Sequence, residues 1–91
     1  MAQQTAEERK GPYDNEVGEA LYQTRILVIS ELARRTGIKR EHMSEIVNGH
    51  RLPSAEQLDS IAEVLGWTAE QLYPREEFRA AIEATRQAVA S

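Results

Sequence analysis

The 91-residue sequence predicts an all-α fold made of short helices. Apolar residues recur three and four positions apart in several segments, which is the spacing that gives a helix one buried face. Capping residues and glycines divide the chain into pieces of helical length. No segment with strand character finds a partner strand elsewhere in the sequence. One small domain with a modest core is therefore expected.

The first helix is expected to follow a polar N-terminal segment, residues 1–13, which we interpret as a flexible arm. Asp14 or Asn15 can cap this helix, because a short polar side chain accepts hydrogen bonds from the first unpaired N–H groups. The helix should end near residue 24 or 25. The segment 25–30 is rich in β-branched residues but short, so it is interpreted as a connection rather than a strand.

Two helices separated by a sharp turn are predicted in the segment 29–49. The first covers about residues 29–36 and the second about residues 39–47, with Gly37 at the turn and Asn48-Gly49 at the end. Such a pair, joined at a steep angle by a turn that contains glycine, is a helix-turn-helix, the unit that places its second helix in the DNA major groove. Its core-facing positions are Leu32, Ala33, Thr36, Ile38, Met43 and Ile46.

The second half of the chain carries clearer helix signals. Ser54 with Gln57, and Thr68 with Gln71, each form the capping-box pattern that opens a helix. Gly66 ends the longer of these two helices. A last amphipathic helix is predicted over residues 76–90. The inward positions of these helices are Leu58, Ile61, Ala62, Leu65, Phe78, Ile82, Thr85 and Val89.

Charge is unevenly distributed along the chain, although its net value is −4. Residues 25–51 hold six basic residues against three acids, whereas residues 52–91 hold three against seven. The positive charge is thus concentrated on the predicted helix-turn-helix, where a DNA surface needs it. Uneven surface charge without a function is the competing explanation.

Several function classes find no support in the sequence. Without cysteine there is no disulfide framework or thiolate metal site, which agrees with a cytoplasmic protein. His42 and His50 lie eight positions apart with no carboxylates arranged around them, so no metal and no cofactor are expected. No apolar run approaches the roughly 20 residues that span a bilayer, and no signal peptide is visible. No carboxylate pair, nucleophile–base set or phosphate loop suggests an enzyme.

Residues 17–73 resemble the lambda-repressor/Cro superfamily of five-helix DNA-binding domains, the XRE family. The resemblance rests on an ordered set of positions and implies a dimeric, non-catalytic transcription regulator of bacterial or phage origin, a repressor or Cro-like switch. Residues 14–74 would form the DNA-binding domain, with residues 75–91 as an additional helix. The positions that carry the resemblance are Leu32-Ala33, Thr36-Gly37-Ile38, Met43-Ser44, Ile46, Asn48-Gly49, Pro53-Ser54 and Ala62-x-x-Leu65-Gly66.

The resemblance also implies which outward residues meet double-stranded DNA. Residues at the positions of Arg40, Glu41 and Glu45 read base edges in the family. Arginine suits guanine as a bidentate donor, and a carboxylate can accept from the cytosine amino group. The solvated face of a short helix would look similar, which is the alternative. Expected contacts to the DNA backbone are Lys39, His42, Ser44, Asn48, His50 and Arg51.

Three departures from the family pattern favour a second function class. Val28 and Ile29 stand where the family usually has a hydroxyl cap and a phosphate-binding Gln. Glu45 makes the recognition helix less positive than is common. Tyr22 and Val47 replace a usual ion pair, so we expect these two side chains to pack together. The apolar residues Ile26, Val28 and Ile29 either fill a corner of the fold or form a patch for a protein partner, as in an antitoxin or an adaptor with little DNA binding.

The predicted C-terminal helix lies beyond the minimal domain and needs a role. Its apolar stripe is formed by Phe78, Ile82 and Val89. The stripe could dock on the core of its own chain, or it could pair with a second copy. Because operators of such proteins usually contain two half-sites, we favour a homodimer that uses this helix.

Overall fold

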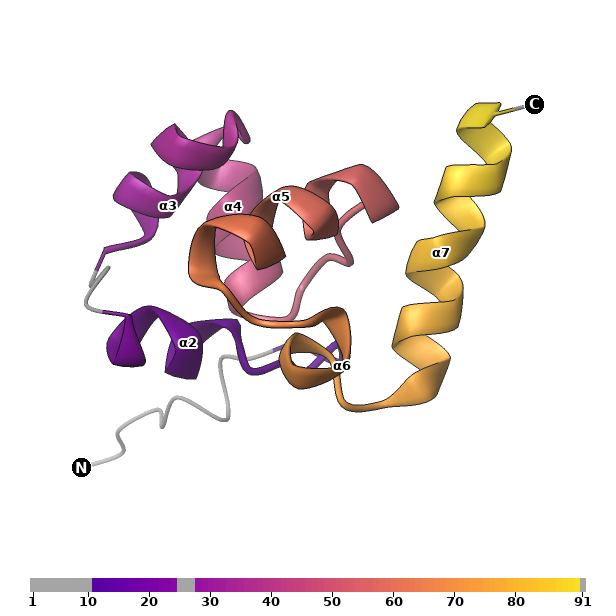
Figure 1. Ribbon diagram of the computed structural model, residues 1–91, viewed down its shortest axis with the longest axis horizontal. Helices are drawn as coiled ribbons and strands as arrows, with labels where there is room; N and C mark the ends of the chain where they lie inside the picture. Colours follow the sequence, from indigo (N-terminus) through magenta and orange to yellow (C-terminus); the bar gives the residue numbers. More distant parts are fainter. Residues whose placement is uncertain (1–10, 25–27, 91) are drawn as a thin grey trace.

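The computed structural model describes residues 11–24 and 28–90, with side chains as far as Gln87. Within these ranges the regular secondary structure is entirely helical, which confirms the predicted all-α class (Figure 1). α5 lies between the α3–α4 pair and α7 (Figure 1). The helices are α2 (Val17–Gln23), α3 (Ile29–Thr36), α4 (Arg40–Val47), α5 (Ala55–Leu65), α6 (Ala69–Leu72) and α7 (Glu76–Ala90).

The helix-turn-helix forms where the sequence predicts it. Gly37 ends α3 in the left-handed conformation, with φ of 77°, and its N–H donates to the carbonyl of Ala33 at 2.9 Å. An L-residue with a side chain rarely adopts this conformation, so glycine is the residue suited to the turn. α4 begins at Arg40, one residue later than predicted, because Lys39 is its N-cap.

The core is one cluster to which every described helix contributes. α3 packs on both α4 and α5, and Met43 and Ile46 place the inner face of α4 in the same core, which leaves the opposite face of α4 at the surface. Burial of this apolar area is the main stabilising term for so small a domain. The buried members are Val17, Ala20, Leu21, Leu32, Ala33, Ile38, Met43, Ile46, Ala55, Leu58, Ile61, Leu65, Leu72, Tyr73, Phe78 and Ile82.

Both predicted capping boxes are present. The Ser54 hydroxyl accepts from the N–H of Gln57 at 3.1 Å, and the Gln57 side chain accepts from the N–H of Ser54 at 2.9 Å. Thr68 and Gln71 repeat this exchange at 3.1 and 2.8 Å. Each box satisfies two N–H groups that the first helical turn would leave unpaired. The starts of α5 and α6 are therefore fixed by local sequence.

α7 docks on the core of its own chain. Phe78 is 9% exposed and Ile82 is 2% exposed, so the two side chains expected to meet a second copy are already buried. The Thr85 hydroxyl accepts from the N–H of Ala55 at 2.8 Å, which pairs the first N–H of α5. Of the two alternatives left by the sequence, these residues take the docked one. The side chain of Val89 lies outside the described residues.

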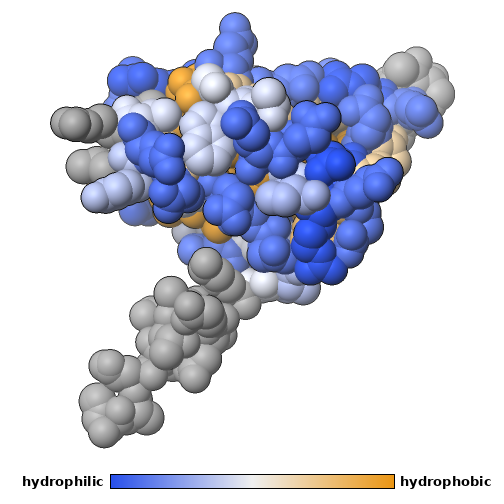
Figure 2. All heavy atoms as spheres, turned by 60° about the horizontal axis from the view of Figure 1, so that its bottom comes forward, coloured by the Kyte–Doolittle hydropathy of each residue, from blue (hydrophilic) through white to orange (hydrophobic). Residues whose placement is uncertain are grey.

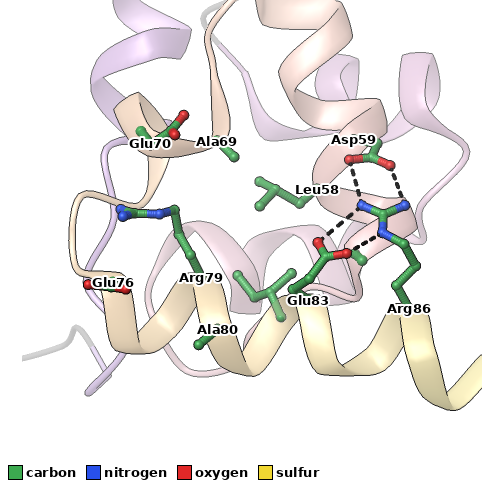
Figure 3. Close-up of a pocket in the computed structure, with 11 residues that line it drawn as sticks. Leu58, Asp59, Ala69, Glu70, Glu76, Arg79, Ala80, Glu83 and Arg86 are labelled. Atoms are coloured by element: carbon green, nitrogen blue, oxygen red, sulfur yellow. Dashed lines mark hydrogen bonds and ion pairs between the residues drawn. The ribbon is translucent and has the colours of Figure 1, made fainter.

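An ion-pair cluster joins the outer side of α7 to α5. Arg86 donates to both carboxylate oxygens of Asp59, at 2.9 and 3.2 Å, and also to Glu83 at 2.6 Å (Figure 3). Together with Leu58 and Ala80 these residues line a cavity of about 350 Å³ between the two helices (Figure 3). α7 is thus held by polar contacts outside its apolar stripe.

Residues 11–15, which we call the N-terminal strap, bind the end of α4. The N–H of Gly11 donates to the carbonyl of Asn48 at 2.8 Å, and the N–H of Tyr13 donates to the carbonyl of Gly49 at 2.9 Å. The Tyr13 ring also meets Phe78 edge-on, with ring centroids 5.5 Å apart. The expected flexible arm over residues 1–13 therefore does not extend to Gly11 and Tyr13, and residues 1–10 lie outside the described part of the chain.

Candidate nucleic-acid interface

The residues expected to contact DNA lie at the N-cap of α4, on its outward face and in the turn after it. Met43 and Ile46 are fully buried and Val47 packs partly against the core, so the other positions of this helix are directed away from it. His42, Ser44 and Glu45 are half-buried on this helix. The members that are exposed are Lys39, Arg40, Glu41, Asn48, His50 and Arg51.

The start of α4 carries two cations that are available to a ligand. Lys39 and Arg40 are exposed, and neither makes an ion pair with any residue of the described ranges. Glu41 beside them is also exposed. Because an arginine without an internal partner keeps all its N–H donors, Arg40 can make the bidentate contact that guanine requires.

The cations of α3 are arranged differently. Arg34 and Arg35 both donate to Glu31, with Arg35 at 2.7 Å. The Arg34 guanidinium, helped by Arg35, lowers the pKa of the Glu31 carboxyl below its usual value. Much of the positive charge of α3 is therefore paired within the helix, whereas Lys39 and Arg40 at the start of α4 have no ion-pair partner among the described residues.

Glu45 and Arg51, both expected to touch DNA, are joined to each other. Arg51 Nε lies 2.7 Å from Glu45 Oε1, and both side chains are 46% exposed. The backbone of the turn is bonded in the same place, since the N–H of His50 donates to the carbonyl of Glu45 at 2.8 Å. Along the same face the Asn48 amide donates to the Ser44 hydroxyl at 3.4 Å.

The start of α3 lacks a side-chain cap. Val28 occupies the N-cap position, makes no side-chain hydrogen bond to the helix, and is 55% exposed. Ile29 packs partly against the core, and Ile26 lies outside the described residues. Tyr22 is 73% exposed, and its expected packing on Val47 stays a prediction. Only Val28, of the three residues proposed as a partner patch, is seen as an exposed apolar side chain.

The surface offers little else that is apolar. On the face drawn in Figure 2, hydrophilic residues dominate and hydrophobic ones form only small patches between them. Large contiguous apolar patches are the usual mark of a stable protein interface. On this face, therefore, the surface gives no sign of a large apolar docking site.

The sequence gives no sign that the strap binds the end of α4. It indicates Asn15 only as a cap for the first helix, and the Asn15 side chain does accept from the N–H of Val17 at 2.9 Å, although the N-cap position itself is Glu16. The same amide donates to the carbonyl of Ile46 at 2.9 Å. With Gly11 it supplies partners for the last carbonyls of α4, which have none within the helix. No local pattern signals a partner 31 residues away.

A helix-turn-helix family model matches residues 25–72, about half of the chain and the segment that contains the geometry described above. The chain belongs to the helix-turn-helix family of XRE, lambda repressor-like type. This is a family of DNA-binding regulatory domains and not of typical enzymes. No curated protein and no solved structure gives a significant match to the chain.

Two further observations concern other kinds of site in this helix-turn-helix protein. Among the described residues, no helix combines the length and the apolar character needed to cross a membrane. The same residues hold no group of three or more His, Cys, Asp or Glu side chains placed to bind a metal ion.

Proposed function

We propose that this protein is a sequence-specific transcriptional regulator that inserts α4 into the DNA major groove and binds two half-sites as a homodimer. The observation that carries the proposal is the division of α4 into two faces. Met43 and Ile46 lock one face into the core, and the other presents polar and charged side chains to solvent. A helix anchored in this way can carry side chains to base edges without reorganising.

The proposed contacts follow from position and chemistry. Arg40, in the first turn of α4, would donate to O6 and N7 of a guanine, and Glu41 would accept from a cytosine amino group. Lys39 precedes the helix, and Asn48, His50 and Arg51 follow it, so they flank the reading face and would hold phosphates. His42 and Ser44 would support these backbone contacts from the flanks of the helix.

Selection of bound sequences from a random DNA pool tests the proposal. We expect a preferred sequence with two half-sites about one helical turn apart, and an affinity that falls steeply with salt. Arg40→Ala should lose about 1–3 kcal/mol of discrimination at one base pair of each half-site. Arg86→Ala removes the same charge from α7 and should leave the preferred sequence unchanged. A pool that yields no preferred sequence at moderate salt would contradict the proposal.

A second candidate function is an adaptor or antitoxin that binds another protein. The exposed Val28 at the N-cap of α3 supports it, because a hydroxyl cap and a following Gln would normally help to hold a phosphate there. Val28→Ser combined with Ile29→Gln would restore that pair. Tighter DNA binding by the double variant, without a change in oligomeric state, would argue that the apolar start of α3 serves no protein partner.

A further inference from the structure

We propose that Glu45 is a positioning residue, which holds Arg51 so that Arg51 can grip a DNA phosphate, rather than a reader of bases. The inference rests on the proposed function, since it concerns how the same face of α4 meets DNA. It assigns to Glu45 a role that neither its charge nor its place on the recognition helix suggests. A lone carboxylate at this position would repel phosphates, so its partner decides what it does.

The geometry of the pair carries this assignment. Arg51 uses its Nε, at 2.7 Å, to donate to Glu45 Oε1. Within the described residues, the two terminal nitrogens of the same guanidinium donate to no acceptor. Those two nitrogens form the planar fork that matches a pair of phosphate oxygens. Glu45 therefore occupies the side of the guanidinium and leaves its binding end open.

The backbone that carries Arg51 is fixed around this pair. The N–H of His50 donates to the carbonyl of Glu45, and the N–H of Gly49 donates to the carbonyl of Ile46 at 3.1 Å. The N-terminal strap closes the other side, because a Cβ at Gly11 would lie 2.1 Å from the carbonyl oxygen of Gly49. Since both the helix end and the turn are held, the ion pair has less conformational entropy to lose than a pair of free surface chains.

The balance of charges also favours a paired role. Exposed ion pairs are weak in water, but they strengthen where DNA excludes water around them. In the pair, the charge of Glu45 is neutralised, so its repulsion of the phosphates is reduced. In the pair, Oε1 of Glu45 is already occupied by Arg51 Nε, so a base-reading Glu45 would have only Oε2 to offer to a cytosine. Keeping the pair satisfies both side chains at once, which is why we assign the phosphate contact to Arg51.

Measurements of DNA affinity with four proteins distinguish the roles: the wild type, Glu45→Ala, Arg51→Ala and the double variant. Positioning predicts that Glu45→Ala weakens binding about three- to tenfold on every sequence, which corresponds to the loss of one modest hydrogen-bonded contact. The double variant should bind no more weakly than Arg51→Ala alone, because Glu45 acts through Arg51. Glu45→Gln should retain most of the affinity, since its amide oxygen can still accept from Nε.

The salt dependence provides a second readout. Arg51→Ala and Glu45→Ala should each reduce the slope of log affinity against log salt by about one, the value for a single phosphate contact. Glu63→Ala is the control: it also removes one exposed carboxylate, but from α5, and one with no ion-pair partner among the described residues. That control should not reduce the slope.

Two outcomes would overturn the inference while leaving the proposed function intact. Tighter binding by Glu45→Ala would mean that the carboxylate only repels DNA, and an altered preference at one base pair would make it a base reader. In the free protein we expect slow exchange of the Arg51 Nε proton, measured by NMR, and Glu45→Ala should abolish it. Slow exchange in the wild type without any DNA binding would refute the proposed function, and the phosphate role with it, but not the ion pair.

Discussion

Gly11→Ala tests whether the N-terminal strap belongs to the folded domain. A Cβ on Gly11 would lie 2.1 Å from the carbonyl oxygen of Gly49 and 2.7 Å from Cα of His50. These contacts are far inside van der Waals distance and involve backbone atoms, which no side-chain rotation can move. The strap must therefore shift away from the end of α4. Both backbone hydrogen bonds that it makes there, from Gly11 and from Tyr13, should weaken or break.

The expected cost follows from those two bonds. Each intramolecular hydrogen bond contributes about 0.5–1.5 kcal/mol net, so losing both lowers the free energy of unfolding by about 1–3 kcal/mol. Displacement of the Tyr13 ring from Phe78 would add to this, because an edge-to-face aromatic pair contributes about 0.5–1.5 kcal/mol. For a domain of this size such a change is a substantial fraction of the total stability.

Equilibrium unfolding in urea, followed by circular dichroism, measures this effect. Gly18→Ala is the matched control, because a Cβ there meets no heavy atom within 4 Å and the residue lies in α2. Alanine is a better helix former than glycine by about 0.5–1 kcal/mol, so the control should be more stable than the wild type. Equal stability of Gly11→Ala and the wild type would refute the reasoning, since the strap would then contribute nothing to the fold.

Two further substitutions test buried polar groups. The Tyr73 hydroxyl is buried and has no hydrogen-bond partner among the described residues, since the nearby Asn15 amide donates to other carbonyls. Tyr73→Phe should therefore match or exceed the wild type in stability at neutral pH. Burial raises the pKa of this hydroxyl far above its usual value of 10.0, with Asn15 opposing in part, so the native state keeps a proton that the unfolded chain releases. Above pH 10.0 the free energy of unfolding of the wild type should fall by up to about 1.4 kcal/mol per pH unit through this group. If the phenylalanine variant loses stability equally in an alkaline titration, the raised pKa of Tyr73 is not the cause. Thr85→Val keeps the shape of the side chain but leaves the N–H of Ala55 without its acceptor, and should cost about 1–2 kcal/mol in thermal unfolding. An unchanged melting temperature would mean that α7 does not cap α5.

Local signals account for what the sequence predicted well. Ser54 with Gln57, Thr68 with Gln71, and the left-handed Gly37 and Gly66 each act within one helical turn. Their effect is set by neighbours in sequence, so the ends of α3, α5 and α6 could be read directly. The inner face of the helix-turn-helix was predictable for the same reason, because apolar periodicity reports which side of a helix is buried.

Interactions between distant segments were harder to predict. The stripe of Phe78 and Ile82 shows that α7 has a buried face, but an apolar stripe carries no information about whether its own core or a second copy covers it. Gly11 and Tyr13 of the strap are bonded through backbone N–H groups, which nearly every residue possesses. The pair of Glu45 and Arg51 spans the end of a helix, where the spacing rules for side chains on one helix no longer apply.

The docking of α7 has a consequence for any attempt to transfer this helix-turn-helix domain into a chimeric protein. The family match ends at residue 72, yet Thr85 of α7 accepts from the first N–H of α5. Phe78 and Ile82 of α7 are also part of the hydrophobic core. A fragment that ends at residue 74 would expose the core surface that Phe78 and Ile82 cover, and it would remove the acceptor for the first N–H of α5, the helix on which α3 packs. Such a fragment would be prone to aggregate and less stable, so the smallest transferable domain runs from Gly11 through α7.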